Sequence, residues 1–253
     1  MINYNLNYGS NIQTGDSIYY NRRCLQVPNG FITGAAGTGK SYFVKKEIMQ
    51  VLQNTEDDII ILDMAGDYKE LVKKNNGMII DLLSEDTHIN PLGISSFDDI
   101  VGLCQISINR ILSHIEIEDI YKILNELCNN SKNPLFKIFY ETLITEADPN
   151  MRNIGLHLKY YIDNTPYVFE GQTNETLNDI YITPKKRIVA YELHNVPSTD
   201  KNFYILLCMI DIWKKIINSY KENSEKRIWL YFDNIYSILQ NEILSNAFGK
   251  IYK

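Results

Sequence analysis

The sequence predicts an α/β fold with a mainly parallel sheet and an all-helical insertion. Short β-branched segments bounded by polar residues, typical of strands buried on both faces, alternate with segments of helical apolar spacing. Such alternation is typical of a parallel sheet. Between residues 95 and 175 the alternation stops, and only helical spacing remains.

The predicted elements follow from these patterns in chain order. A small hairpin is expected from 17–20 and 24–27 around the turn-prone Asn21. The strands are expected near 30–33, 58–63, 78–82, 187–193 and 228–233. A helix follows the first of them, and a long helix precedes the last, with a buried stripe formed by Phe203, Leu206, Leu207, Ile210, Trp213, Ile217 and Tyr220.

The insertion is expected to hold four helices. The first runs from Phe97 to Ile115, and three more have their apolar faces within 120–127, 136–143 and 151–162. Pro91 marks where the insertion begins. The chain therefore divides into residues 1–94 and 176–253, the two parts of one core, and residues 95–175, a helical subdomain.

Composition excludes several classes of protein. With 253 residues, 45% hydrophobic and 22% charged, the chain is an ordinary globular protein. A net charge of −6 argues against a protein that coats nucleic acid, so any contact with DNA is expected to be local. The four scattered cysteines and the lack of a signal peptide indicate a reduced, cytosolic protein without disulfide or zinc sites. The longest apolar run, 203–210, is too short to span a membrane.

One motif carries specific chemistry. Residues 34–41, GAAGTGKS, match GxxxxGK[ST] in full between an expected strand and an expected helix, which is the phosphate-binding P-loop or Walker A context. Glycines let the backbone wrap a phosphate, and the N–H groups of residues 36–41 point at it. Lys40 supplies a cation to the β and γ phosphates, and Ser41 offers a hydroxyl to Mg²⁺. The predicted nucleotide-binding residues are Gly34, Ala36, Gly37, Thr38, Gly39, Lys40 and Ser41.

A second acid completes such a site. Asp233 ends the buried segment 228–233 and is predicted to be the Walker B aspartate that holds Mg²⁺ together with Ser41. A helix N-cap is the structural alternative for Asp233. The next residue, Asn234, is an amide that orients water but cannot accept its proton.

These motifs, taken in order, resemble the conjugative-transfer ATPases of type IV secretion systems (VirB/TraC type), in their nucleotide-binding portion and Gram-positive form. The resemblance rests on Walker A, the segment ILDMAGDY at 61–68, INPL at 89–92, the helical insertion, QTN at 172–174 and Walker B. The Asp-x-x-Gly-acid-Tyr element is shared with HerA/FtsK-like DNA pumps. The resemblance implies a P-loop NTPase of RecA-like fold that uses ATP and Mg²⁺.

The chain departs from that family at three points. Asp67 stands where the family has glutamate, and Asn234 replaces the Walker B glutamate, so hydrolysis is in question while ATP binding is not. Asp67 is the one nearby carboxylate available as a substitute base, with Asn234 orienting the water. The third departure is length, because the membrane-facing domain before Walker A and the arginine-finger segment after Walker B are expected in full members. The chain is therefore expected to be a fragment, the product of a truncated gene or a cut-down relative.

The resemblance also implies a function and partners. The chain is expected to be a cytoplasmic ATPase module at the inner face of the membrane, in a homo-oligomeric ring with secretion-channel components and without direct membrane contact. The alternatives are a non-hydrolysing nucleotide-binding scaffold and a fragment of a HerA/FtsK-like DNA translocase. The densest basic run, 185–187, is interpreted as a solvated loop rather than a DNA-facing loop.

Overall fold

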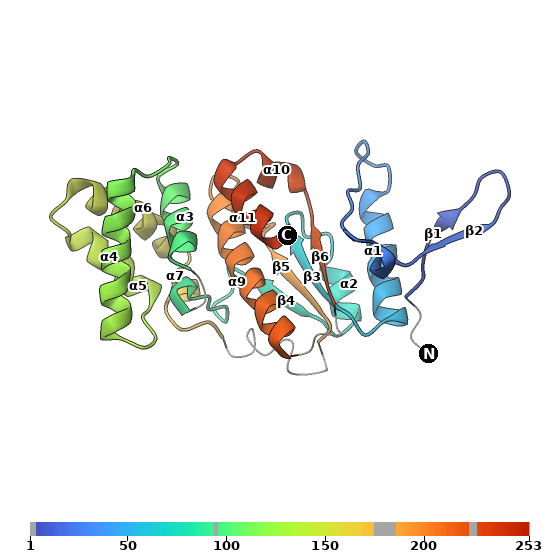
Figure 1. Ribbon diagram of the computed structural model, residues 1–253, viewed down its shortest axis with the longest axis horizontal. Helices are drawn as coiled ribbons and strands as arrows, with labels where there is room; N and C mark the ends of the chain where they lie inside the picture. The colour runs from blue at the N-terminus through green and yellow to red at the C-terminus, as the bar shows by residue number, and fades with distance from the viewer. Residues whose placement is uncertain (1–3, 94–95, 175–185, 223–226, 253) are drawn as a thin grey trace.

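A four-stranded parallel sheet organises the chain in the computed structural model, which describes residues 4–93, 96–174, 186–222 and 227–252 (Figure 1). The strand order is β4-β5-β3-β6. The strands are β3 (Asp58–Asp63), β4 (Met78–Asp81), β5 (Ile188–Glu192) and β6 (Ile228–Phe232). These match four of the five predicted strands, and all six residues of β3 are buried, as a central strand requires.

The side chains of β3 alternate between two apolar cores. Ile59 and Ile61 pack with α1 (Lys40–Asn54) and α2 (Lys69–Lys74). Ile60 and Leu62 face the larger core, which includes α9 (Lys201–Glu222) and extends into the helical insertion. Helices thus cover both faces of the sheet, as Figure 1 shows. The period of two along a strand produces this division.

The insertion is helical throughout its described residues and lies beyond α9, on the side away from α1 (Figure 1). Its helices are α3 (Phe97–Ser107), α4 (His114–Asn130), α5 (Phe136–Thr145), α6 (Pro149–Asn164) and α7 (Pro166–Phe169), after a short 3₁₀ turn η2 (Pro91–Gly93). The predicted single helix from Phe97 to Ile115 is wrong. Asn109 takes a left-handed φ of 51°, which ends α3, and Ser113 starts α4 with a capping box to Glu116.

The INPL and QTN motifs, at the two ends of the insertion, are hydrogen-bonded to each other. Asn90, 1% exposed, donates to the side chain of Gln172 at 2.9 Å, and its own N–H donates to the hydroxyl of Thr173 at 3.0 Å. Its side-chain oxygen accepts from the N–H of Phe136 at 3.0 Å. Because a buried amide needs hydrogen-bond partners, Asn90 fixes the INPL segment to the QTN segment and to the start of α5.

The N-terminal hairpin differs from the prediction. It pairs β1 (Leu6–Ser10) with β2 (Ser17–Tyr20), and residues 24–27 form no strand. Asn21 instead caps the 3₁₀ helix η1 (Arg22–Cys24) by accepting from the N–H of Arg23 at 2.9 Å. Asparagine suits either a turn or a cap, and here the cap prevails.

The predicted strand at 30–33 is also wrong. This segment has no strand partner among the described residues, and β6 is hydrogen-bonded to β3 alone. Phe31 is 63% exposed. A strand-like composition forms a strand only beside a pairing partner, and just before this segment the carbonyl of Pro28 accepts from Arg22 at 3.2 Å instead of from a strand.

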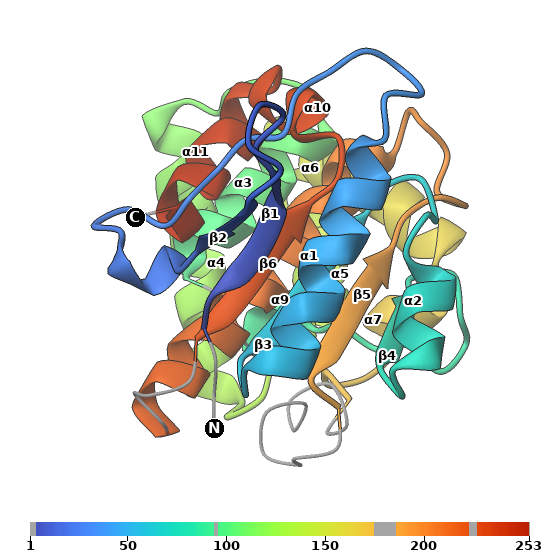
Figure 2. The same cartoon turned by 90° about the vertical axis from the view of Figure 1, so that its right-hand side faces the viewer.

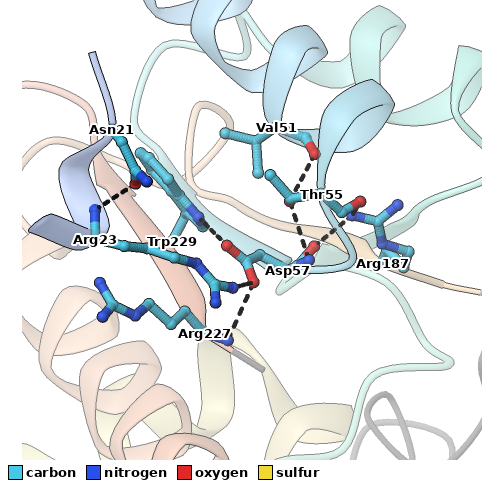
Figure 3. Close-up of polar contacts among 8 residues, drawn as sticks. All are labelled: Asn21, Arg23, Val51, Thr55, Asp57, Arg187, Arg227 and Trp229. Atoms are coloured by element: carbon cyan, nitrogen blue, oxygen red, sulfur yellow. Dashed lines mark hydrogen bonds and ion pairs between the residues drawn. The ribbon is translucent and has the colours of Figure 1, made fainter. Parts of the chain in front are cut away.

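A polar cluster ties η1 to the amino ends of the strands (Figure 3). The carboxylate of Asp57, 1% exposed, is bound by the guanidinium of Arg23 and by the indole N–H of Trp229, at 3.0 Å. Arg187 donates to the carbonyls of Leu52, at 3.0 Å, and Asp57, at 2.7 Å. Arg187 therefore has a structural role within the predicted basic run, while Lys185 lies outside the described residues.

The last two helices, α10 (Ile235–Leu239) and α11 (Glu242–Tyr252), follow β6 and pack beside α9 (Figure 1). On α9, the predicted stripe is buried at most positions, but Ile217 is 37% exposed. The side chain of Tyr220 lies outside the described part.

Candidate functional site

The phosphate loop leads into the amino end of α1, above the carboxyl ends of the strands (Figure 2). Its two inner glycines are left-handed, Gly37 with φ 76° and Gly39 with φ 89°, a conformation that residues with a Cβ rarely adopt. The ammonium of Lys40 folds back on the loop and donates to the carbonyls of Gly34, at 2.9 Å, and Ala35, at 2.8 Å. The lysine is thus held inside the loop.

The remaining predicted loop residues support the same shape. The hydroxyl of Thr38 donates to the Ala35 carbonyl at 2.8 Å, and a Cβ on Gly34 would lie 2.7 Å from that hydroxyl oxygen. Residues 31–39, including Ala36, are exposed. Gly39 caps α1 without a side-chain hydrogen bond, so the N–H groups of the first turn of α1, including that of Ser41, receive no side-chain cap; with the helix dipole behind them, such groups favour an anion.

Asp233 lies at the carboxyl end of β6, half-buried, and its N–H donates to the Leu62 carbonyl of β3 at 3.1 Å. Burial raises the pKa of Asp233, and the negative charges of Asp63 and Asp67 raise it further, while Lys40 acts in the opposite direction. These charges act on one another only because the fold brings the four residues together. The acids come from the ends of two neighbouring parallel strands.

Asn234 has a left-handed backbone, with φ 52° and ψ 50°, and starts α10. Its carbonyl accepts from the N–H of Ser237 at 3.1 Å and from the Ser237 hydroxyl at 2.9 Å. Asparagine is several-fold enriched in this conformation, so the backbone alone favours it over glutamate at this position.

Asp63 has a role that the sequence reasoning missed. Its Oδ1 accepts from the N–H groups of Ala65 (3.3 Å), Gly66 (2.8 Å) and Asp67 (3.1 Å), and its Oδ2 from that of Tyr68 (2.9 Å). Asp63 is 1% exposed and therefore shapes the loop that carries Asp67. The available signals were its position at the end of a buried strand and its place as the first residue of the Asp-x-x-Gly-acid-Tyr element.

A cavity of about 360 Å³ adjoins the Walker B residues. It is lined by Met64, Ala65, Ser198, Lys201, Asn202, Ile205, Asp233, Asn234 and Ser237. The ammonium of Lys201, at the start of α9, donates to the Met64 carbonyl at 3.2 Å. Sequence reasoning missed Lys201 too, because only the fold places α9 beside the end of β6.

The donor set fits a magnesium nucleotide. Mg²⁺ usually takes one or two protein oxygens and completes its shell with phosphates and water, and Ser41 and Asp233 supply such oxygens. Over the described residues, histidine, cysteine and carboxylate side chains form no group of three that would cage a metal. Lys40 and the N–H groups of α1 supply the positive counterpart for phosphates.

The fold and this site define the class as a P-loop NTPase. The family model for the central domain of helicase HerA matches residues 31–207. Because that match covers well over half of the chain, the protein belongs to the HerA central-domain family.

A solved structure shares the fold. VirB4 of Thermoanaerobacter pseudethanolicus matches with a TM-score of 0.77 and 16% identity, over 97% of this chain and 71% of the VirB4 chain. No curated protein matches the chain.

Among the helices that the structure describes, none is both long and apolar enough to cross a bilayer.

Proposed function

We propose that this chain is the ATP-binding motor module of a conjugative DNA-transfer or type IV secretion apparatus. The observation that carries the proposal is that the P-loop, at the amino end of α1, and Asp233, after β6, lie at the same end of the sheet. There α1 is joined to β6 by the hydrogen bond from Tyr231 to Glu47 at 3.0 Å, and the charge of Lys40 acts to lower the pKa of Asp233. The HerA family membership and the fold shared with VirB4 support it.

In this proposal the predicted residues have distinct tasks. The loop from Gly34 to Ser41 binds the phosphates of ATP, and Asp233 and Ser41 bind Mg²⁺. Bound Mg²⁺ neutralises phosphate charge. Asp67 accepts the proton of a water that Asn234 orients. A homo-oligomeric ring places the module at the inner face of the membrane beside channel components, with DNA reached through local contacts.

Calorimetry of ATP binding to Lys40→Ala tests the proposal. Lys40 neutralises phosphate charge in a partly shielded site, so its loss costs on the order of 1.5–3 kcal/mol, about tenfold to more than a hundredfold in affinity. Lys137→Ala, an exposed lysine on α5, is the matched control and keeps wild-type affinity. Equal affinities for Lys40→Ala and the wild type would remove the proposed function.

A non-hydrolysing scaffold is the second candidate, and Asn234 is the observation that favours it. The missing general base is worth typically 10²–10⁴-fold, so the chain by itself is expected to turn over ATP more slowly than about one per second. If Asp67 serves as the base, Asp67→Asn abolishes the remaining turnover while ATP affinity persists. A scaffold shows ATP binding and no turnover in either protein. A DNA translocase, the third candidate, shows turnover that duplex DNA stimulates.

A further inference from the structure

Glu47 forms a buried polar cluster away from the nucleotide site. This side chain, on α1 and 4% exposed, accepts from the hydroxyls of Tyr8, at 2.6 Å, and Tyr231, at 3.0 Å. Its carboxylate also pairs with the guanidinium of Arg22 at 2.9 Å, and Arg22 donates to the Tyr8 hydroxyl at 2.8 Å. The hairpin, the P-loop helix and β6 therefore meet at one carboxylate.

The cluster is in register with the nucleotide site. Glu47 follows Lys40 by seven residues, two helical turns, so both lie on one face of α1 about 10 Å apart along the axis. Tyr231 precedes Asp233 by two residues, so both lie on one face of β6 about 7 Å apart. The hydrogen bond between Glu47 and Tyr231 therefore joins the same face of α1 that carries Lys40 to the same face of β6 that leads to Asp233.

We propose that Glu47 is a positioning residue that fixes the phosphate-binding helix α1 against the metal-binding end of β6. The inference rests on the proposed function, because it assigns Lys40 to phosphate and Asp233 to Mg²⁺. Lys40 and Asp233 act on one ligand only when α1 and β6 keep their spacing. Glu47 sets that spacing.

Hydrogen bonds are needed here because the surrounding contacts are not directional. Around Glu47 the two elements meet through apolar side chains, including Ile48, Val51 and Trp229, which tolerate small shifts. Burial and the Glu47 carboxylate raise the pKa of Tyr8 to about 12, and burial, with the charge of Glu47, raises that of Tyr231. Both phenols therefore keep their protons at neutral pH and donate to Glu47.

The hairpin is part of the same arrangement. Arg22 reaches Glu47 from η1, and the next residue, Arg23, binds Asp57 at the amino ends of the strands (Figure 3). On α1, the side chain of Gln50 accepts from the backbone N–H of Asn7 on β1 at 2.6 Å and donates to the Asn7 carbonyl at 3.0 Å. The hairpin and η1 thus contact both α1 and the amino ends of the strands of the four-stranded sheet.

The test compares ATP affinity with and without Mg²⁺ in the full chain. The measured quantity is the affinity for ATP with Mg²⁺ divided by the affinity without it. This enhancement by Mg²⁺ is expected to be full only when Lys40 and Asp233 are held in position together. Glu47→Gln is expected to lower this ratio by about tenfold, the effect typical of losing a charge-assisted hydrogen bond, and to leave metal-free ATP affinity close to wild type. Tyr231→Phe, which removes one hydroxyl, is expected to lower it by about threefold.

Two matched controls separate positioning from general destabilisation. Glu116→Gln breaks a comparable ion pair with Arg110 in the insertion, and Tyr191→Phe removes a buried hydroxyl from β5 that donates to Asp211. Both lower the melting temperature and leave the affinity ratio unchanged. If Glu47→Gln unfolds the chain, the affinity ratio of Tyr231→Phe alone tests the positioning role.

The outcomes distinguish this inference from the proposed function. A wild-type chain that binds no nucleotide overturns both. A wild-type chain whose Mg²⁺ enhancement is lost in Asp233→Ala but retained in Glu47→Gln and Tyr231→Phe overturns the positioning role alone. Glu47 is proposed to act through Asp233, so Glu47→Gln should change the affinity ratio little when Asp233→Ala is already present. If Glu47→Gln lowers the ratio as much in the Asp233→Ala background as it does in the wild type, the positioning role is also overturned.

Discussion

Replacing Asp63 with asparagine tests whether this carboxylate shapes the loop before Asp67. The carboxylate is 1% exposed and accepts four backbone N–H groups, three on one oxygen and that of Tyr68 on the other. Asparagine keeps one acceptor oxygen and turns an NH₂ group toward the remaining donor. At least one charge-assisted bond is therefore lost and one buried N–H is left without an acceptor.

The expected cost of Asp63→Asn is about 2 kcal/mol, which for a chain of this size lowers the melting temperature by roughly 4–8 °C. Differential scanning calorimetry or thermal unfolding followed by circular dichroism measures it. Asp81→Asn is the matched control, because Asp81 ends β4 and its side chain accepts one N–H, that of Leu83, at 3.0 Å. An asparagine oxygen satisfies that single bond, so the control shifts by less than about 0.5 kcal/mol. A melting temperature for Asp63→Asn as high as that of Asp81→Asn would refute the reasoning.

Three further predictions follow from the site and the insertion. Asp233→Ala is expected to weaken Mg·ATP more than metal-free ATP in calorimetry, and equal losses would mean that Asp233 does not hold the metal; it is not a helix cap, because Asn234 is the N-cap of α10. Asn234→Glu places a longer side chain at φ 52° and should cost about 1 kcal/mol in unfolding free energy, whereas Asn234→Gly should be nearly neutral; a neutral glutamate would contradict the backbone argument. Hydrogen bonding to Arg110 lowers the pKa of Glu116 to about 2. This lowered pKa contributes stability that is present above the ordinary value of 4.5 and lost as pH falls toward 2. Urea unfolding of Arg110→Met should therefore depend less on pH in that range, and parallel curves for mutant and wild type would show that the pair contributes nothing.

Local signals in the sequence were sufficient for most elements. The central strands β3 and β5 were predictable because strands buried on both faces require short runs of β-branched residues, such as 58–63. The edge strands β4 and β6 are only partly buried and were predictable from their short apolar runs bounded by polar residues. The P-loop was predictable because left-handed turns need glycine at fixed spacing, as at Gly37 and Gly39. Asp233 was predictable because it follows a strand-like apolar segment in a chain with a complete Walker A motif, although that strand, β6, is only partly buried.

Tertiary context decided the elements whose local signals were ambiguous. Residues 30–33 have a strand-like composition but pair with no strand in the described chain, because pairing depends on what lies beside a segment. Helical spacing continues through Asn109, yet its left-handed backbone divides the predicted helix. Asn21 suited a turn or a cap; it caps η1, whose Arg22 and Arg23 bind the distant carboxylates of Glu47 and Asp57.

The arrangement of the site shows the same division. The sequence alone determined which residues bear chemistry, because a glycine-rich loop, a lysine and a strand-ending acid each need a particular residue type. Only the tertiary structure placed Lys201 beside Asp233, and Glu47 between Tyr8 and Tyr231. Those contacts join residues up to 184 positions apart in the chain. No local pattern encodes such a separation, because the pairing of partners depends on the sheet order and on how α1 packs across it.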